Sequence, residues 1–170
     1  MRVRKTTLRL RQYNYSQPGY YFVTLCVKNR ECIFGDVKND VMILNIYGKI
    51  AYQYWMDIPN HYSNILLDKF VIMPNHIHGI IIIKPTTNRH MVEAGAEQCS
   101  APTYGNVRKN NYGLLSKIIK SFKNMCTKQY RNNHNHIFQW QRSYHDHIIR
   151  NDLELQRIQQ YIIDNPKKLK

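Results

Sequence analysis

Paired cysteines and long apolar runs are both missing from this sequence, and each absence excludes a class of protein. Cys26, Cys32, Cys99 and Cys126 are scattered, and no two of them form a Cys-x-x-Cys pair. This spacing excludes a zinc ribbon or a disulfide framework and indicates reduced thiols. Every apolar run is well short of the ~20 residues that a membrane span requires. We therefore expect a soluble, cytoplasmic protein.

Acidic residues are also few, and the resulting charge points to a partner class. The chain has 25 Lys and Arg against 11 Asp and Glu, so its formal net charge is +14. Such an excess raises the local concentration of a polyanion around the protein. Nucleic acid is the leading partner class, although many basic proteins bind none. Arg2 and Arg4 belong to a basic N-terminal arm, MRVRKTTLRL, that is expected to follow phosphates. No unbroken apolar stretch follows this arm at once, so a secretory leader is not expected.

The composition predicts a folded single domain over residues 1–170. The hydrophobic fraction is 43% and the aromatic fraction 12%, far from the composition of disordered chains. A chain of 170 residues can bury a sizeable core without disulfides. Residues 84–111 are polar and without periodicity, which predicts a flexible loop within the domain.

Apolar periodicity predicts strands and helices in the order β-β-α-β-β-α-β-α. Strands are predicted over residues 20–28, 41–45, 65–73, 76–83 and 144–149. Helices are predicted over residues 46–58, 112–130 and 151–164. Pro59 is expected to end the first helix and Asn151 to cap the last. Strand hairpins mixed with helices on one face indicate an antiparallel sheet of the α+β class.

The second predicted helix carries lysines away from its apolar face. Lys120 and Lys123 are candidates to face a phosphate backbone, and a solvated charged face is the alternative.

One histidine pair has the geometry of a metal site. Residues two apart in a strand point to the same side, so His76 and His78 present two imidazoles together while Ile77 points to the opposite face. His-x-His alone is a weak signal, because satisfied polar histidines are common. Two further pairs occur, at 134/136 in an Asn-rich turn and at 145/147 on a strand. Solvation is the default for the first, and structural support or DNA contact for the second.

The last predicted helix could place a nucleophile beside a metal ligand. Tyr161 and Asn165 are four residues apart and therefore lie on one helix face. A neutral phenol is a poor nucleophile, and a nearby cation favours the phenolate. A half-buried tyrosine of purely structural function is the alternative.

Four ordered motifs resemble one known family. The motifs are YSQPGYYFVTLCVKNRECIFGDV (15–37), VIMPNHIHGIIII (71–83), FQWQRSYHDHIIRN (138–151) and YIIDNP (161–166). They resemble the REP-associated tyrosine transposases, which belong with the insertion-sequence-200-like transposases in the HUH endonuclease superfamily. The resemblance covers nearly the whole chain apart from residues 84–111.

The resemblance implies a fold, a reaction and site residues. It implies a ferredoxin-like fold in a bacterial protein that cuts and rejoins single-stranded DNA through a 5′-phosphotyrosine intermediate. His76 and His78 match the two metal-binding histidines, Tyr161 matches the nucleophile, and Asn165 falls where relatives often place a Gln ligand. The matched tryptophan segment implies active-site support or DNA contact by Trp140, Gln141, Arg142 and His147.

The ligand set and the fixed tyrosine lead to further expectations. Two neutral imidazoles and an amide oxygen suit Mg²⁺ or Mn²⁺, although imidazole also accepts Zn²⁺ or Ni²⁺. The expected partner is single-stranded DNA, including strands presented beside a hairpin, with no membrane. The protein is expected to act as a monomer, with a homodimer as the alternative.

Three other functions stay open on the sequence alone. A non-catalytic binder of single-stranded nucleic acid would be indifferent to Tyr161→Phe. A hydrolytic nuclease with His145 or His147 as its base would cut without a covalent adduct. A structural zinc protein would neither bind nor cut oligonucleotides.

Overall fold

The computed structural model of the protein describes residues 13–85, 113–134 and 138–168. The basic arm with Arg2 and Arg4 lies outside the described residues, as does nearly all of the loop predicted at 84–111.

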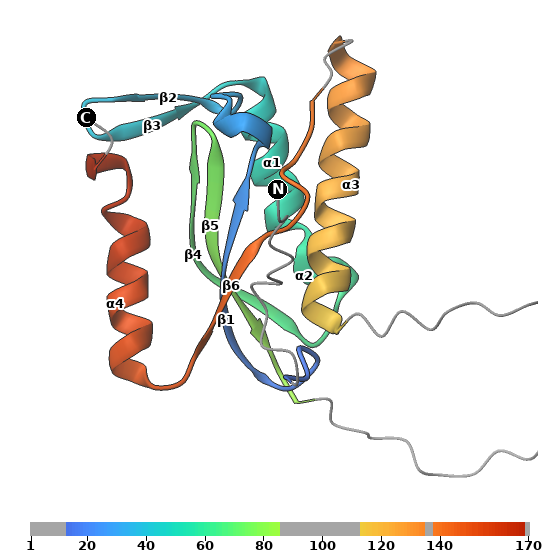
Figure 1. The fold of residues 1–170 in the computed structure, drawn as a ribbon, viewed down its shortest axis with the longest axis vertical. Helices are drawn as coiled ribbons and strands as arrows, with labels where there is room; N and C mark the ends of the chain where they lie inside the picture. The colour runs from blue at the N-terminus through green and yellow to red at the C-terminus, as the bar shows by residue number, and fades with distance from the viewer. Residues whose placement is uncertain (1–12, 86–112, 135–137, 169–170) are drawn as a thin grey trace, which may run out of the picture.

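A four-stranded antiparallel sheet with the strand order β4-β5-β1-β6 lies at the centre of the fold (Figure 1). Its strands are β1 (Gly19–Cys26), β4 (Ile65–Met73), β5 (His76–Ile83) and β6 (His145–Ile149). β4 and β5 form the predicted hairpin, joined at Pro74 and Asn75. The predicted α+β class with an antiparallel sheet is confirmed.

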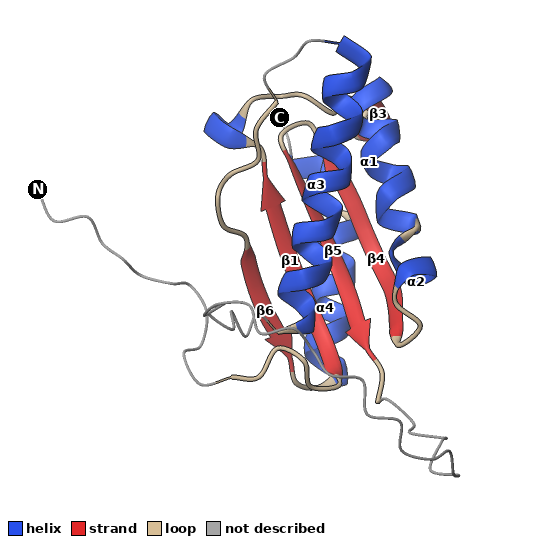
Figure 2. Cartoon of the chain, turned by 90° about the vertical axis from the view of Figure 1, so that its right-hand side faces the viewer, coloured by secondary structure: helices blue, strands red, loops and turns tan. Residues whose placement is uncertain are grey.

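The helices lie on both faces of this sheet. They are α1 (Ile46–Met56), α2 (Ile58–His61), α3 (Leu114–His134) and α4 (Asp152–Ile163), with short 3-10 turns η1 (Lys28–Arg30) and η2 (Pro166–Lys168). Figure 2 shows α1 and α3 in front of the sheet and α4 behind it. The expectation of helices on one face therefore holds for α1 to α3, while α4 covers the opposite face. None of the helices in the described ranges is both long enough and apolar enough to cross a membrane.

Alternation along the central strands explains why both faces need cover. Ile77, Ile81 and Ile83 of β5 join the main core under α1 and α3. Ile80 points the other way and forms a second, smaller cluster with Ile149 and Ile162. Because β5 is apolar on both sides beyond His78, water must be excluded from both. α4 supplies the cover for the second face.

Gly79 allows the main core to close over β5. An added Cβ at this residue would lie 2.3 Å from the ring of Trp55, which is fully buried. Only glycine lets the indole pack against the strand at this distance. The strand that carries both histidines is therefore held firmly from behind.

Two local predictions need correction. β2 (Gly35–Lys38) and β3 (Val41–Leu44) form a separate two-stranded sheet, and β2 was not predicted because GDVK lacks a β-branched or aromatic run. Pro59 does not end a helix but lies in the first turn of α2, where its missing N–H costs nothing. Asn151 does cap α4, since its side chain accepts a hydrogen bond from the N–H of Glu154 at 2.8 Å.

Candidate active site

β5 presents His76 and His78 side by side on the face that α4 covers. Their ring centroids are 4.5 Å apart with an interplanar angle of 75°. The two residues are 9% and 6% exposed, whereas Ile77 between them is fully buried in the opposite core. Alternation along the strand therefore produces the paired imidazoles that the sequence predicts.

Hydrogen bonds fix the orientation of both rings. Nδ1 of His76 donates to Oδ1 of Asn75 at 2.6 Å, and Nδ1 of His78 lies 2.9 Å from the hydroxyl of Thr24 on β1. Thr24 is the register partner of His78 across the β1–β5 ladder. With Nδ1 engaged in each ring, Nε2 is the nitrogen left to bind a cation, which is the usual arrangement of metal-binding histidines.

Burial keeps both imidazoles neutral. Loss of solvent lowers the pKa of His76 to about 4, with a further contribution from the charge of Arg30. Burial likewise lowers the pKa of His78 to about 3, helped by His76 and Arg30. Neutral imidazole is the form that coordinates a metal.

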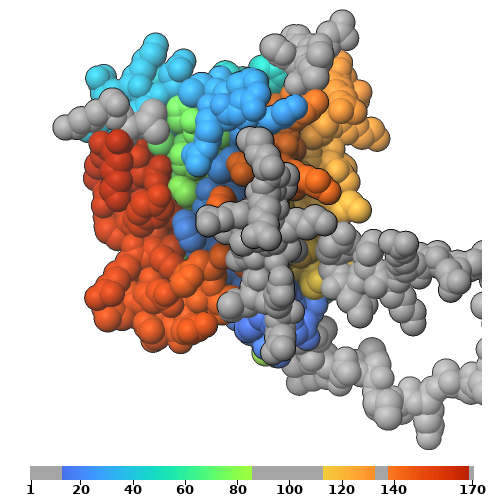
Figure 3. All heavy atoms as spheres, in the orientation of Figure 1, coloured from blue at the N-terminus to red at the C-terminus, as the bar shows by residue number. Residues whose placement is uncertain are grey.

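Tyr161 of α4 lies against the histidine pair. Its hydroxyl is 3.4 Å from Nε2 of His78, and the two ring centroids are 5.3 Å apart. Phe22 lines the other side, stacked on His78 and edge-on to Tyr161. Tyr161 is nevertheless 39% exposed, so a substrate can reach the phenol. In the space-filling view, β4–β5 atoms in green are visible between α4 in red and the blue segment of the chain (Figure 3).

α4 is held in this position by its own contacts with the sheet. Ile162 is buried against Ile80 and Ile149, and the side-chain amide of Gln159 donates to Asp68 of β4 at 2.6 Å. These contacts orient the helix face that carries Tyr161 toward β5.

Asn165 lies just beyond the end of α4. It is 7% exposed, and its backbone carbonyl accepts a hydrogen bond from the N–H of Lys168 at 3.1 Å. The amine of Lys168 lies 4.5 Å from the centre of the Tyr161 ring. The segment that follows α4 thus brings the ammonium of Lys168 close to the phenol ring.

The donor set fits a divalent ion in part. His76 and His78 offer two neutral nitrogens, and Asn165 on the segment that follows α4 is the predicted source of an amide oxygen. Within the described ranges, however, no group of three His, Cys, Asp or Glu side chains gathers anywhere. A cation here would depend on two protein nitrogens plus weaker oxygen donors, the mixed set that Mn²⁺ or Mg²⁺ accepts.

Two of the other predicted contact residues, Trp140 and Lys123, are engaged on the α3 side of the sheet, away from this cluster. The indole of Trp140 packs in the main core against Phe34 and Phe122. Lys123 donates to the carbonyl oxygens of Gln141 and Ser143, both at 3.0 Å. Trp140 and Lys123 are therefore engaged within the protein.

The remaining predicted contacts are at the surface. Gln141, Arg142 and Lys120 are exposed. Nε2 of His147 is bound to Glu154 at 2.6 Å, which joins β6 to the first turn of α4.

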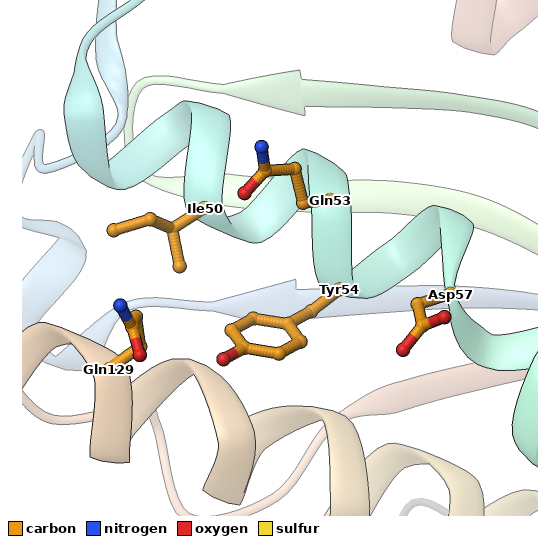
Figure 4. Close-up of a pocket in the computed structure, with 5 residues that line it drawn as sticks. All are labelled: Ile50, Gln53, Tyr54, Asp57 and Gln129. Atoms are coloured by element: carbon orange, nitrogen blue, oxygen red, sulfur yellow. The ribbon is translucent and has the colours of Figure 1, made fainter.

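A cavity of about 360 Å³ lies elsewhere, between α1 and α3 (Figure 4). It is lined by Ile50, Gln53, Tyr54, Asp57 and Gln129. Because α1 and α3 cover the opposite face of the sheet from α4, this cavity is separate from the histidines and Tyr161.

Three residues near the cluster were not predicted. Thr24 carries a hydrogen bond to His78, Arg30 places its charge near both imidazoles, and Lys168 lies over Tyr161. Only the strand register could have indicated Thr24. Nothing in the sequence alone sets Arg30 or Lys168 apart from the other basic residues.

Comparison with known proteins places the chain beside an uncharacterized protein of Haemophilus influenzae. The two are 37% identical over 166 residues, which cover 95% of this chain and 88% of the other. This chain belongs to the family of that protein. No family model matches the sequence.

Two solved structures are similar to this chain to different degrees. A REP-associated tyrosine transposase bound to a REP hairpin has a TM-score of 0.60 at 18% identity, over 94% of this chain and 73% of that one. A putative transposase from Deinococcus radiodurans has a TM-score of 0.49 at 15% identity, over 93% and 96% of the two chains. The first likeness establishes a shared fold.

Proposed function

We propose that this protein is a transposase-like endonuclease that cuts and rejoins single-stranded DNA through Tyr161. The observation that carries the proposal is the 3.4 Å separation between the Tyr161 hydroxyl and Nε2 of His78. The half-exposed phenol can serve as a nucleophile, and the two neutral, buried imidazoles beside it can bind a cation. The shared fold with a hairpin-bound REP-associated transposase supports single-stranded DNA near a hairpin as the substrate.

The reaction exchanges one phosphate ester for another. The Tyr161 oxygen attacks the phosphorus and loses its proton, while the bond from phosphorus to the 3′ oxygen breaks and that oxygen gains a proton. The products are a 5′-phosphotyrosine and a free 3′-hydroxyl, so the ester bond is conserved and the step can be reversed on another strand. A Mg²⁺ or Mn²⁺ ion held by His76, His78 and Asn165 would supply positive charge for the phosphate oxygens.

The test is covalent capture on labelled single-stranded oligonucleotides, with and without a flanking hairpin, in Mn²⁺. We expect the wild type to form an adduct that survives denaturing electrophoresis, and Tyr161→Phe to form none. Tyr20→Phe is the matched control, because Tyr20 is also 39% exposed and lies on the same face of the sheet. An adduct from Tyr161→Phe would show that the nucleophile is another residue.

The histidines are tested in the same assay. His76→Ala and His78→Ala should abolish cleavage and leave most of the charge-driven binding intact. His145→Ala, which removes an exposed imidazole from β6, should still cut. Equal loss of binding and cleavage in the first two variants would mean that these histidines are structural.

A non-catalytic binder of single-stranded nucleic acid is the second candidate. It is favoured by the absence, within the described ranges, of a third His, Cys, Asp or Glu beside the histidine pair. Such a protein would bind the same oligonucleotides but give no adduct and no cleavage, and Tyr161→Phe would not change its affinity.

A further inference from the structure

Two cations outside the predicted site approach the histidines and the phenol from different segments. We propose that Arg30 and Lys168 form a phosphate-binding pair that holds one phosphate of the DNA strand against Tyr161. This inference rests on the proposed function and adds two positioning residues to it.

The backbone around η1 places Arg30 next to the histidine strand. Cys26 at the end of β1 is the register partner of His76, and the chain then turns through η1. The segment is bonded to the β4–β5 turn on both sides of Arg30. Val27 N–H donates to the carbonyl of Asn75 at 2.9 Å, and Ile33 N–H donates to that of Pro74 at 2.8 Å. Arg30 is therefore fixed at the start of the strand that carries His76.

The turn itself is conformationally unfavourable. Asn29 and Arg30 have φ values of 56° and 59°, the left-handed region that non-glycine residues rarely adopt. Asn tolerates this region, whereas an arginine there is strained and a glycine would adopt the same backbone conformation without strain. Strained backbone of this kind is concentrated at functional sites, where the side chain is needed in one place.

Lys168 lies close to the phenol, on the segment that follows α4. Its amine lies 4.5 Å from the Tyr161 ring centre, while the adjacent Lys167 is bound to Asp164 at 2.8 Å. Among the described carboxylates, none forms an ion pair with Arg30 or Lys168. Both residues are exposed, so an anion can reach both charges, and the ammonium of Lys168 also helps to lower the pKa of the nearby Asp164 carboxyl.

The chemistry of the pair suits a phosphodiester. Guanidinium offers a planar fork of donors that matches two phosphate oxygens, and an ammonium adds a compact point charge. The backbone bonds from Val27 and Ile33 to the β4–β5 turn hold Arg30 beside the turn that leads into His76. A phosphate held by Lys168 would lie next to the Tyr161 ring, and Arg30 would contact the same phosphate from the turn that precedes His76.

The chain supplies a matched control for each cation. Lys28 lies in the same turn as Arg30, but its amine is bound to Gln139 at 2.7 Å, and Lys167 is the neighbour of Lys168. Arg30→Gln and Lys168→Gln are therefore compared with Lys28→Gln and Lys167→Gln, which remove the same charge nearby.

The first measurement does not depend on cleavage. The dinucleotide d(TpT), with one phosphodiester, is titrated into the protein and followed by NMR. We expect Arg30→Gln and Lys168→Gln each to weaken binding at least threefold, with the two controls within twofold of the wild type. Equal weakening by the test and control variants would overturn the proposal, because it would show only a general loss of charge.

The second measurement separates this proposal from the proposed function. On an oligonucleotide that the wild type cuts, Arg30→Gln and Lys168→Gln should lower the single-turnover rate at least tenfold and the controls at most twofold. An adduct at Tyr161 with all four variants equal refutes the cation pair and leaves the endonuclease standing. Selective d(TpT) binding without any wild-type adduct supports the cation pair and refutes the endonuclease.

Arg30→Gly guards against a trivial folding defect. Glycine relieves the left-handed strain, so this variant should melt at or above the temperature of the wild type while losing d(TpT) affinity as Arg30→Gln does. A lower melting temperature together with unchanged affinity would mean that Arg30 serves only the fold.

Discussion

The hydroxyl of Thr24 on β1 lies 2.9 Å from Nδ1 of His78 on the adjacent strand. These residues are direct register partners, so the contact is built into the sheet and does not depend on a loop. It fixes the ring so that Nε2 points toward Tyr161. The central sheet thus orients the imidazole through a side chain, Thr24, that no sequence motif singled out.

Replacing Thr24 should weaken a metal site without unfolding the protein. Thr24→Val keeps the shape and β propensity of the side chain but removes the hydroxyl that holds His78. Loss of such a hydrogen bond to a ligating histidine typically lowers metal affinity by about 10- to 100-fold. Titration with Mn²⁺ should show a decrease of this order, and Thr24→Ser should restore most of the affinity. Equal Mn²⁺ affinity of Thr24→Val and the wild type would show that His78 is not a metal ligand.

The part of the site that was predictable is the part set by short-range periodicity. The His76/His78 pair follows from strand alternation, and the helical repeat places Tyr161 on α4, although α4 ends at Ile163 and Asn165 therefore does not share its helix face as predicted. That Tyr161 meets the histidine pair depends on α4 crossing the second face of the sheet, and no local pattern encodes that crossing. The prediction that all helices lie on one face of the sheet was wrong for α4. A run of isoleucines such as that of β5 is compatible with helices on one face or on both.

The contacts of the basic residues were the hardest to predict, because the local sequence around a lysine does not show whether it binds a partner, bonds within the protein or faces solvent. Lys123 was a candidate for DNA contact, yet its amine is bound to two backbone carbonyls. Arg30 was not a candidate, and its position depends on two successive left-handed residues. Which cation lies near the phenol is decided by long-range packing of the chain.

The pH dependence of stability should report the buried histidines. Their pKa values lie at about 4 and about 3 in the folded protein and near 6.5 when unfolded. Above pH ~6.5 both imidazoles are neutral in the folded and in the unfolded protein, so they contribute no pH dependence to the free energy of unfolding. As the pH falls below 6.5, the unfolded state takes up protons that the folded state refuses, so the free energy of unfolding decreases.

Two protons bound only by the unfolded state give a slope of at most about 2.7 kcal/mol per pH unit. Urea unfolding in a chelator between pH 5 and 6.5 measures this slope before carboxylates begin to titrate. His76→Gln and His78→Gln should each reduce this slope by the contribution of one proton, up to about 1.4 kcal/mol per pH unit. His145→Gln, at an exposed position, serves as the control. A slope unchanged in all three variants would contradict the burial of the pair.

Lys120 and Lys123 lie on the same helix, and their different contacts predict different effects. Lys123→Ala removes two hydrogen bonds from the amine to carbonyls of the 141–143 segment, as well as a contact with the ring of Trp140. We expect the free energy of unfolding to fall by about 1–2 kcal/mol. Lys120→Ala, at an exposed position, should change it by no more than about 0.5 kcal/mol. Equal effects in urea unfolding would argue against the structural role of Lys123.

The attachment of α4 should be the weak point of the active site. Among the described residues, the buried members of the cluster beneath this helix are Ile80, Ile149 and Ile162, whereas the main core on the other face is far larger. Regions with few buried apolar contacts open locally before the protein unfolds globally. Asn151→Ala removes the cap of α4 and should lower the stability of that helix by about 1 kcal/mol.

Hydrogen exchange followed residue by residue can locate that cost. Amides of α4 should exchange faster than those of β1 and β5 in the wild type, and Asn151→Ala should speed exchange in α4 while leaving the strands nearly unchanged. The cut-and-join rate should fall in parallel, because Tyr161 is positioned only while α4 is docked. If exchange accelerates equally in α4 and in the sheet, the helix unfolds with the core, and local opening does not control access to the phenol.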